Sequence, residues 1–166
     1  MITMTKKFVV SVKDRVMWAL CIAAYVLIAD WYSPCCIVRA DLSQGSMVEE
    51  RPFGSSPDED QLIMILANLA MFVAFEPDSY KVTRQDQIPD ALLDMIAERL
   101  KRRGEIHDHA AVLKERDRLL CNVSAILREN HMYHLSLAAV LMKGTLTTCV
   151  IEELKACHCK NDDNVA

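Results

Sequence analysis

Apolar residues recur at three- and four-residue spacing in two segments of the second half of the chain. Over about 90–103 they are Leu92, Leu93, Ile96 and Leu100. Over about 108–130 the same spacing continues for several turns, while charged residues occupy the opposite side. This spacing brings side chains to one face of an α-helix. The pattern therefore predicts two amphipathic helices whose apolar faces pack on a common core.

An earlier segment, 62–75, is apolar on every side except at Asn68. Ser56 is placed to cap it, Pro57 suits the first helical position, and Glu59 completes a capping box. Fourteen residues of helix span only about 21 Å, which is shorter than the roughly 30 Å hydrocarbon core of a membrane. We therefore expect the buried central helix of a bundle rather than a membrane span.

Two shorter helices are expected near the C-terminus. The first covers about 133–142 and ends at Lys143-Gly144, where a glycine can terminate a helix. The second covers about 146–156, although its β-branched residues favour strand more than helix. Together with the segments above, they predict an all-α fold, a compact bundle of four to five helices over 56–159.

The composition agrees with a helical domain. Hydrophobic residues make up 52% of the chain and aromatic residues 6%, with only four glycines and five prolines. Such a mixture favours helices over strands. The polar, proline- and glycine-containing residues 41–55 are expected to form a linker, and the polar residues 160–166 a flexible tail.

The first 40 residues follow the order of a secretory leader. Residues 1–15 contain four basic residues against one acidic residue, and an unbroken apolar run follows at 16–29. Val38 and Ala40 match the small residues that precede a signal-peptidase cut. The sequence therefore predicts a signal peptide over 1–40, removed after Ala40, and a secreted mature chain.

Two other interpretations of this segment stay open. An uncleaved signal anchor would use the longer stretch 16–38 and would make a single-pass membrane protein. A buried N-terminal helix of a cytosolic protein would have the same hydrophobicity, because an apolar run of this length does not by itself distinguish these states. A membrane interaction is expected only for the anchored form.

The cysteines bear on the same choice. The chain contains seven, and a cut after Ala40 would leave Cys121, Cys149, Cys157 and Cys159. An even number agrees with an oxidising compartment, in which four cysteines allow three pairings. We favour a disulfide between Cys121 and Cys149, with Cys157 free or paired between molecules. The alternative is four reduced thiols in a cytosolic protein.

Two short motifs would be modification sites in a secreted chain. Asn122-Val123-Ser124 is an acceptor for N-glycosylation at Asn122. Arg99, Lys101 and Arg102 form the pattern that furin-type convertases read, with cleavage after Arg102. The same cations also suit the last turn of a helix, where they offset the negative end of the helix dipole.

The sequence offers little for catalysis or nucleic-acid binding. Its glycines stand alone, so they form no phosphate-binding loop, and the Glu-x-x-His pairs of di-metal bundles are missing. Neither His131 with His134 nor Cys157 with Cys159 has the usual zinc spacing. A net charge of −4 argues against binding to a phosphate backbone. We therefore expect no catalytic residue, no cofactor, no metal site and no nucleic-acid partner.

Two functions fit these features. The first is a secreted helical signalling protein, cytokine-like or a peptide-hormone precursor, that acts by binding a receptor. Its binding face would be the polar side of the helix over 108–130, centred on Glu115, Arg116 and Arg118.

The second is a membrane-tethered or cytosolic protein-interaction module. Residues 88–93, 103–106 and 113–115 are similar to the middle of death-effector-type bundles. The resemblance covers a small part of the chain, and the Arg-x-Asp-Leu signature of a later helix is not present. It implies a death-fold-like adaptor or regulator, and most of the shared pattern is that of any amphipathic helix.

Overall fold

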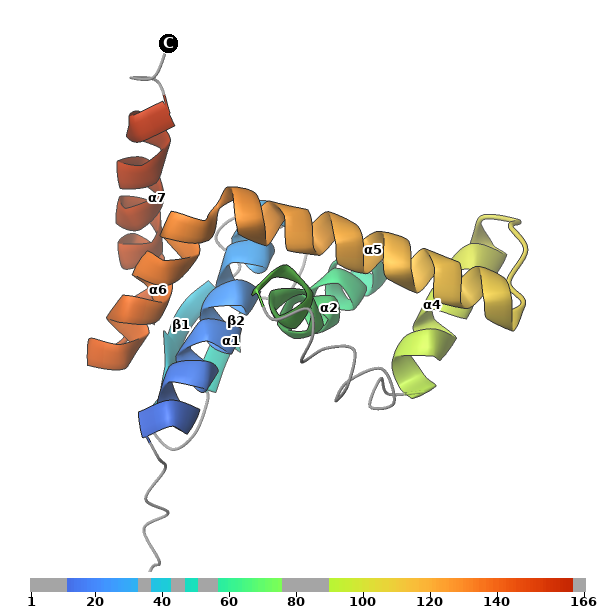
Figure 1. Cartoon of the computed structure of the whole chain (residues 1–166), viewed down its shortest axis with the longest axis horizontal. Coiled ribbons are helices and arrows are strands. Elements are labelled where there is room, and N and C mark those ends of the chain that lie inside the picture. Colours follow the sequence, from blue (N-terminus) through green and yellow to red (C-terminus); the bar gives the residue numbers. More distant parts are fainter. Residues whose placement is uncertain (1–11, 33–36, 43–46, 51–56, 76–89, 163–166) are drawn as a thin grey trace, which may run out of the picture.

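The computed structural model describes residues 12–32, 37–42, 47–50, 57–75 and 90–162 (Figure 1). Within these residues the fold is mostly helical, with six helices and three short strands. The helices are α1 (Val12–Tyr32), α2 (Pro57–Phe75), α4 (Asp90–Arg102), α5 (His109–Glu129), α6 (His131–Lys143) and α7 (Thr148–Asp162). The strands are β1 (Ile37–Asp41), β2 (Met47–Glu50) and β3 (Leu146–Thr147). The predicted helical class is confirmed, and five helices follow α1 in the described residues.

Local capping explains the hairpin formed by α4 and α5. Gly104 adopts a φ of +69°, and the N–H of Glu105 donates to the carbonyl of Leu100 at 3.0 Å, which ends α4. Asp108 then accepts a hydrogen bond from the N–H of Ala111 at 2.8 Å and starts α5. The two helices lie side by side at one end of the molecule (Figure 1).

Asn130 separates α5 from α6. Its backbone N–H and its side-chain amide both donate to the carbonyl of Ile126, at 3.0 and 2.9 Å. A single residue therefore ends one helix and precedes the next, and α6 begins at His131, two residues before the predicted start. Figure 1 shows the resulting bend, after which α6 turns away from the axis of α5.

The small sheet was not expected. β1 pairs antiparallel with β2 on one side and with β3 on the other, in the order β2-β1-β3. Ala40 faces Val48 in one ladder and Leu146 in the other. The all-α prediction is therefore correct only in outline, and part of the predicted linker, 47–50, is a strand. The last helix starts at Thr148 because the two residues before it belong to the sheet.

The largest departure from the sequence interpretation concerns α1. This helix lies among α2, α5 and α6 and contacts all three (Figure 1). Its buried residues are Ala19, Ile22, Ala23, Ala24, Val26, Leu27, Ile28, Ala29 and Asp30. The segment predicted to be a removable leader thus supplies a central helix, and the predicted cut after Ala40 falls inside β1. Among the described residues, no helix is both long and apolar enough to cross a membrane.

α2 is less enclosed than its apolar sequence implies. Leu66 and Ala70 are fully buried against α1 and α5, whereas Asn68 is exposed and Leu69 is half-buried. Phe75, at the end of the helix, is also exposed. The prediction that α2 is buried on every side is therefore wrong, because its neighbours cover one side more completely than the other.

Candidate functional site

A pocket forms where the C-terminal end of α1 meets the α5–α6 junction and α7. Its volume is about 80 Å³. The lining residues are Leu27, Asp30 and Trp31 of α1, Asn130 and Tyr133 at the junction, and Lys155 and His158 of α7. We call it the α1–α7 pocket. It combines aromatic walls, a carboxylate and a cation from segments that are far apart in the sequence.

An ion pair closes one side of the pocket. The Nζ of Lys155 lies 2.8 Å from Oδ2 of Asp30. The Asp30 side chain is only 11% exposed, while that of Lys155 is 44% exposed. A buried carboxylate that lost this counter-ion would be strongly destabilising, because its desolvation would no longer be offset. The pair therefore joins α7 to the end of α1, and its negative member is the more enclosed one.

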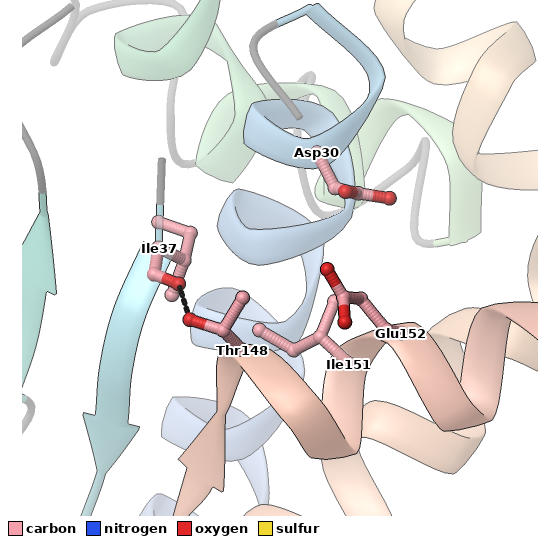
Figure 2. Close-up of a pocket in the computed structure, with 5 residues that line it drawn as sticks. All are labelled: Asp30, Ile37, Thr148, Ile151 and Glu152. Atoms are coloured by element: carbon pink, nitrogen blue, oxygen red, sulfur yellow. Dashed lines mark hydrogen bonds between the residues drawn. The ribbon is translucent and has the colours of Figure 1, made fainter. Parts of the chain in front are cut away.

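A second, smaller cavity lies on the other side of Asp30. Its volume is about 10 Å³, and its lining residues are Asp30, Ile37, Thr148, Ile151 and Glu152. Figure 2 shows Asp30 descending from α1 and Glu152 reaching toward it from α7, while the Thr148 hydroxyl donates to the Ile37 carbonyl at 2.8 Å. A space of this size holds about one water molecule at most. Two carboxylates, the buried Asp30 and the exposed Glu152, thus line this small cavity.

His158 is held in place by neighbours on α6. Its Nε2 lies 3.0 Å from the Oγ of Ser136, and that hydroxyl donates to the carbonyl of Met132 at 3.0 Å. Its ring also lies 5.7 Å from the ring of Tyr133, whose hydroxyl donates to the Ile151 carbonyl at 3.4 Å. The Ser136 hydroxyl and the Tyr133 ring thus hold the His158 ring against α6.

His134 fixes α1 against α6. It is 1% exposed, and its Nε2 lies 2.9 Å from the carbonyl oxygen of Leu20 in α1. A neutral ring that donates from Nε2 fits this contact. The ring stacks on Phe75 with centroids 5.5 Å apart. Burial lowers the pKa of His134 below its usual range, and the nearby His131 acts in the same direction, while the Leu20 hydrogen bond opposes them.

This lowered pKa predicts a loss of stability in acid. The unfolded chain takes up a proton at His134 near the ordinary pKa of about 6.5, whereas the folded chain resists protonation until a lower pH. The unfolded state therefore binds more protons in this window, and the free energy of unfolding falls as the pH drops below about 6.5. We expect His134→Gln to flatten this dependence in urea denaturation measured between pH 7 and pH 5. The exposed His109, at the start of α5, offers the control, His109→Gln, and equal slopes in the two variants would contradict the assignment.

The predicted partner-binding face is not an open polar surface. Glu115 is buried, and its carboxylate accepts hydrogen bonds from Nε and Nη2 of Arg118, both at 2.6 Å. This pair holds the pKa of Glu115 below its usual range; burial opposes the shift, and Arg99 and Arg103 add attraction from α4. Arg116 instead pairs with the adjacent Asp117 at 2.6 Å. Glu115 therefore points inward while its partner Arg118 is half exposed, and partner binding at a face centred on Glu115, Arg116 and Arg118 stays a prediction.

The predicted convertase motif lies in the last turn of α4. Leu100 is 3% exposed, and the Nζ of Lys101 lies 3.7 Å from the Glu98 carboxylate. Cleavage after Arg102 would require this turn to unwind, because proteolysis of folded chains proceeds through locally opened states. Processing at Arg99, Lys101 and Arg102 stays a prediction.

The glycosylation motif lies on the surface of α5. Asn122 is exposed, while the Ser124 side chain is fully buried. The Ser124 hydroxyl donates to the carbonyl of Cys121 at 3.0 Å and accepts from Arg128 at 3.2 Å. Glycosylation of Asn122 would have to precede or tolerate this packing, and it stays a prediction.

The favoured disulfide is not formed. Cys21, Cys121, Cys149 and Cys157 are free thiols, so the structure holds no Cys121–Cys149 bridge. The Cys149 thiol donates to the Glu153 carboxylate at 3.5 Å, and this contact raises the pKa of the thiol. The side chain of Cys159 lies outside the described residues. No group of three or more histidine, cysteine or acidic side chains in the described part of the chain is placed to hold a metal ion.

Sequence reasoning missed every residue of the α1–α7 pocket. Asp30 and Trp31 fell within the predicted leader, and Lys155 and His158 carry no motif. One signal was available: Asp30 follows the apolar run of α1 directly, and a carboxylate beside such a run needs a counter-ion if the run is buried.

Comparisons with known proteins give no identity to this arrangement. No protein-family model, no curated protein and no solved structure matches the chain.

Proposed function

We propose that this chain is a non-catalytic helical module that keeps α1 and binds a protein partner at the α1–α7 pocket. The observation that carries the proposal is the position of Trp31, which is 54% exposed at a pocket that also contains an ion pair with a buried carboxylate. Tyr32, beside it in sequence, is 37% exposed. Tryptophan and tyrosine are enriched among the residues that dominate protein interfaces.

The size of the pocket favours a partner's side chain over a small-molecule substrate. Cavities that hold cofactors or drug-sized ligands usually measure about 300–1,000 Å³, whereas this pocket measures about 80 Å³. A volume of that order suits the end of one side chain. The polar groups also support binding rather than catalysis, since the Asp30 carboxylate is already paired with Lys155.

This proposal follows the interaction-module hypothesis and not the secreted-hormone hypothesis. Its support is the burial of nine α1 residues, which a cut after Ala40 would remove. Secretion itself stays a prediction that the N-terminal sequence of the native protein tests directly. A mature chain beginning at Asp41 would contradict our proposal, because Asp30 and Trp31 would be lost with α1.

Site-specific photo-crosslinking tests the location of the binding surface. A photoreactive residue would replace Trp31 in one variant and Ile106 in the other; Ile106 is 74% exposed in the turn between α4 and α5 and serves as the control. We expect a discrete protein adduct at position 31 in extract of the native source, and weaker or different adducts at position 106. Excess unlabelled wild-type chain should suppress the adduct, whereas excess Trp31→Ala chain should not. Identical adducts at both positions would place the binding surface elsewhere.

A further inference from the structure

The two side chains of the Asp30–Lys155 ion pair differ in how far they are exposed and in how freely they can move. Asp30 sits on the central helix with a side chain that is 11% exposed, so its carboxylate is held in place. Lys155 projects from α7 with 44% of its side chain exposed, and a lysine has a long flexible stem that can carry its ammonium group to solvent. The carboxylate is therefore a fixed feature of the pocket, and the cation beside it is replaceable.

Charge decides which kind of group can take the place of Lys155. Within the lining of the α1–α7 pocket, Asp30 provides the carboxylate and Lys155 provides the ammonium group. An anion that displaced Lys155 would itself place a second negative charge beside the buried Asp30 carboxylate, which is strongly unfavourable. A neutral apolar group that displaced the lysine would leave the same carboxylate unpaired. Only a cationic group can therefore replace Lys155 as the counter-ion of Asp30.

The walls add a preference for an ammonium group on an aliphatic stem. Trp31, Tyr133 and His158 line the pocket, and the faces of tryptophan and tyrosine attract cations. The hydroxyl of Tyr133 is already bound to a backbone carbonyl, so this residue offers mainly its ring. Leu27 completes an apolar side against which methylene groups can pack.

We propose that the α1–α7 pocket receives the ammonium group of a lysine side chain from a protein partner, which replaces Lys155 as the counter-ion of Asp30. Lys155 then acts as a built-in competitor that keeps the Asp30 carboxylate paired until the partner arrives. This inference rests on the proposed function, and it names the chemistry that the pocket recognises.

The test uses n-butylammonium as a probe of the lysine side chain. The variant Lys155→Met removes the competing charge and keeps an unbranched apolar stem, and Lys143→Met is the control at an exposed lysine on α6. Binding is followed by the indole N–H resonance of Trp31 in the full-length chain, with Trp18 as the internal reference. Titrations with sodium chloride, n-butanol and n-butanesulfonate correct for ionic strength and for apolar contact.

We expect Lys155→Met to bind n-butylammonium with an affinity about tenfold or more above that of the wild type, because a tethered competitor has been removed. Lys143→Met should bind like the wild type. Trp31→Ala combined with Lys155→Met should lose the gain; because this variant lacks the reporter indole, its affinity and that of Lys155→Met are compared by isothermal titration calorimetry. Equal affinities in Lys155→Met and the wild type would overturn the inference. An equal response to n-butanol or n-butanesulfonate would overturn it as well.

Lys155→Met can also destabilise the fold, since it leaves the Asp30 carboxylate without a counter-ion. In that case the melting temperature of the variant is measured instead. n-Butylammonium should raise the melting temperature of Lys155→Met, while n-butanesulfonate at the same ionic strength should not. Equal effects of the two salts would contradict the site.

The two proposals fail in different ways. A chain that crosslinks a partner at position 31 but shows no ammonium preference retains the proposed function and loses this inference. If the crosslinked partner is obtained, the adduct should map next to a lysine of that partner, and an adduct on a lysine-free segment would overturn the assignment. Ammonium binding without any crosslinked partner would overturn the proposed function and the protein origin of the ligand, and would leave only the ammonium preference of the pocket.

Discussion

A chain that lacks residues 1–40 should not fold. The deletion removes α1, whose nine buried residues lie among α2, α5 and α6. Four of them, Ile22, Val26, Leu27 and Ile28, have large aliphatic side chains that are at most 6% exposed. Full burial of such a side chain contributes about 1.5–3 kcal/mol, so the four together represent roughly 6–12 kcal/mol. A whole domain is usually stable by about 5–15 kcal/mol.

The deletion also breaks specific contacts. His134 loses the Leu20 carbonyl, Lys155 loses Asp30, and the sheet loses most of β1. Far-UV circular dichroism and thermal melting of residues 41–166 and of the full chain measure the effect. A chain lacking only residues 1–11 is the control, since it loses basic residues of the predicted leader and keeps α1. Helical spectra and a cooperative melt for residues 41–166 would show that α1 is dispensable and would favour the cleaved-leader interpretation.

The sequence predicted the amphipathic helices well and left three interpretations of the α1 segment open, for one physical reason. In α4 and α5 the apolar residues occupy one side, so the pattern itself says which side is buried. In α1 nearly every position is apolar, and the same run suits a signal peptide, a membrane anchor or a buried helix. The buried-helix interpretation is distinguished from the other two only by the apolar faces of α2, α5 and α6. These faces would be exposed to water if α1 did not pack on them.

The sheet was missed because its strands depend on distant partners. β3 contains only two residues, and it pairs with β1 from the other end of the chain. The Thr148 hydroxyl, which donates to the Ile37 carbonyl, links the same two segments. Such short strands have no periodicity of their own, and their formation depends on long-range packing more than on local propensity.

The candidate site was beyond sequence reasoning for a related reason. Asp30 and Lys155 become neighbours only because α7 crosses the end of α1, and no spacing along the chain expresses this. For the charged residues of α5, the sequence predicted exposure where the structure shows burial in one case. Glu115 stands in a run of charged residues and was expected on the surface, yet it lies inward with Arg118 as its partner. Charge alone does not place a residue outside when a second charge is available to pair with it.

Leu66→Asp should also unfold the domain, and Leu69→Asp should not. Leu66 is 0% exposed on the side of α2 that faces its neighbours, whereas Leu69, three residues later on the same helix, is half-buried. An unpaired carboxylate at a fully buried position adds a desolvation penalty of several kcal/mol to the lost apolar burial, and the sum approaches the whole stability of a domain. At position 69 the carboxylate can reach water, so we expect the free energy of unfolding to fall by about 1–2 kcal/mol.

Urea denaturation followed by circular dichroism distinguishes the Leu66→Asp and Leu69→Asp variants. A cooperative transition for Leu66→Asp at the wild-type midpoint would mean that α2 does not belong to the core. Similar unfolding of both variants would instead mean that α2 is enclosed on both sides, as its sequence alone predicts.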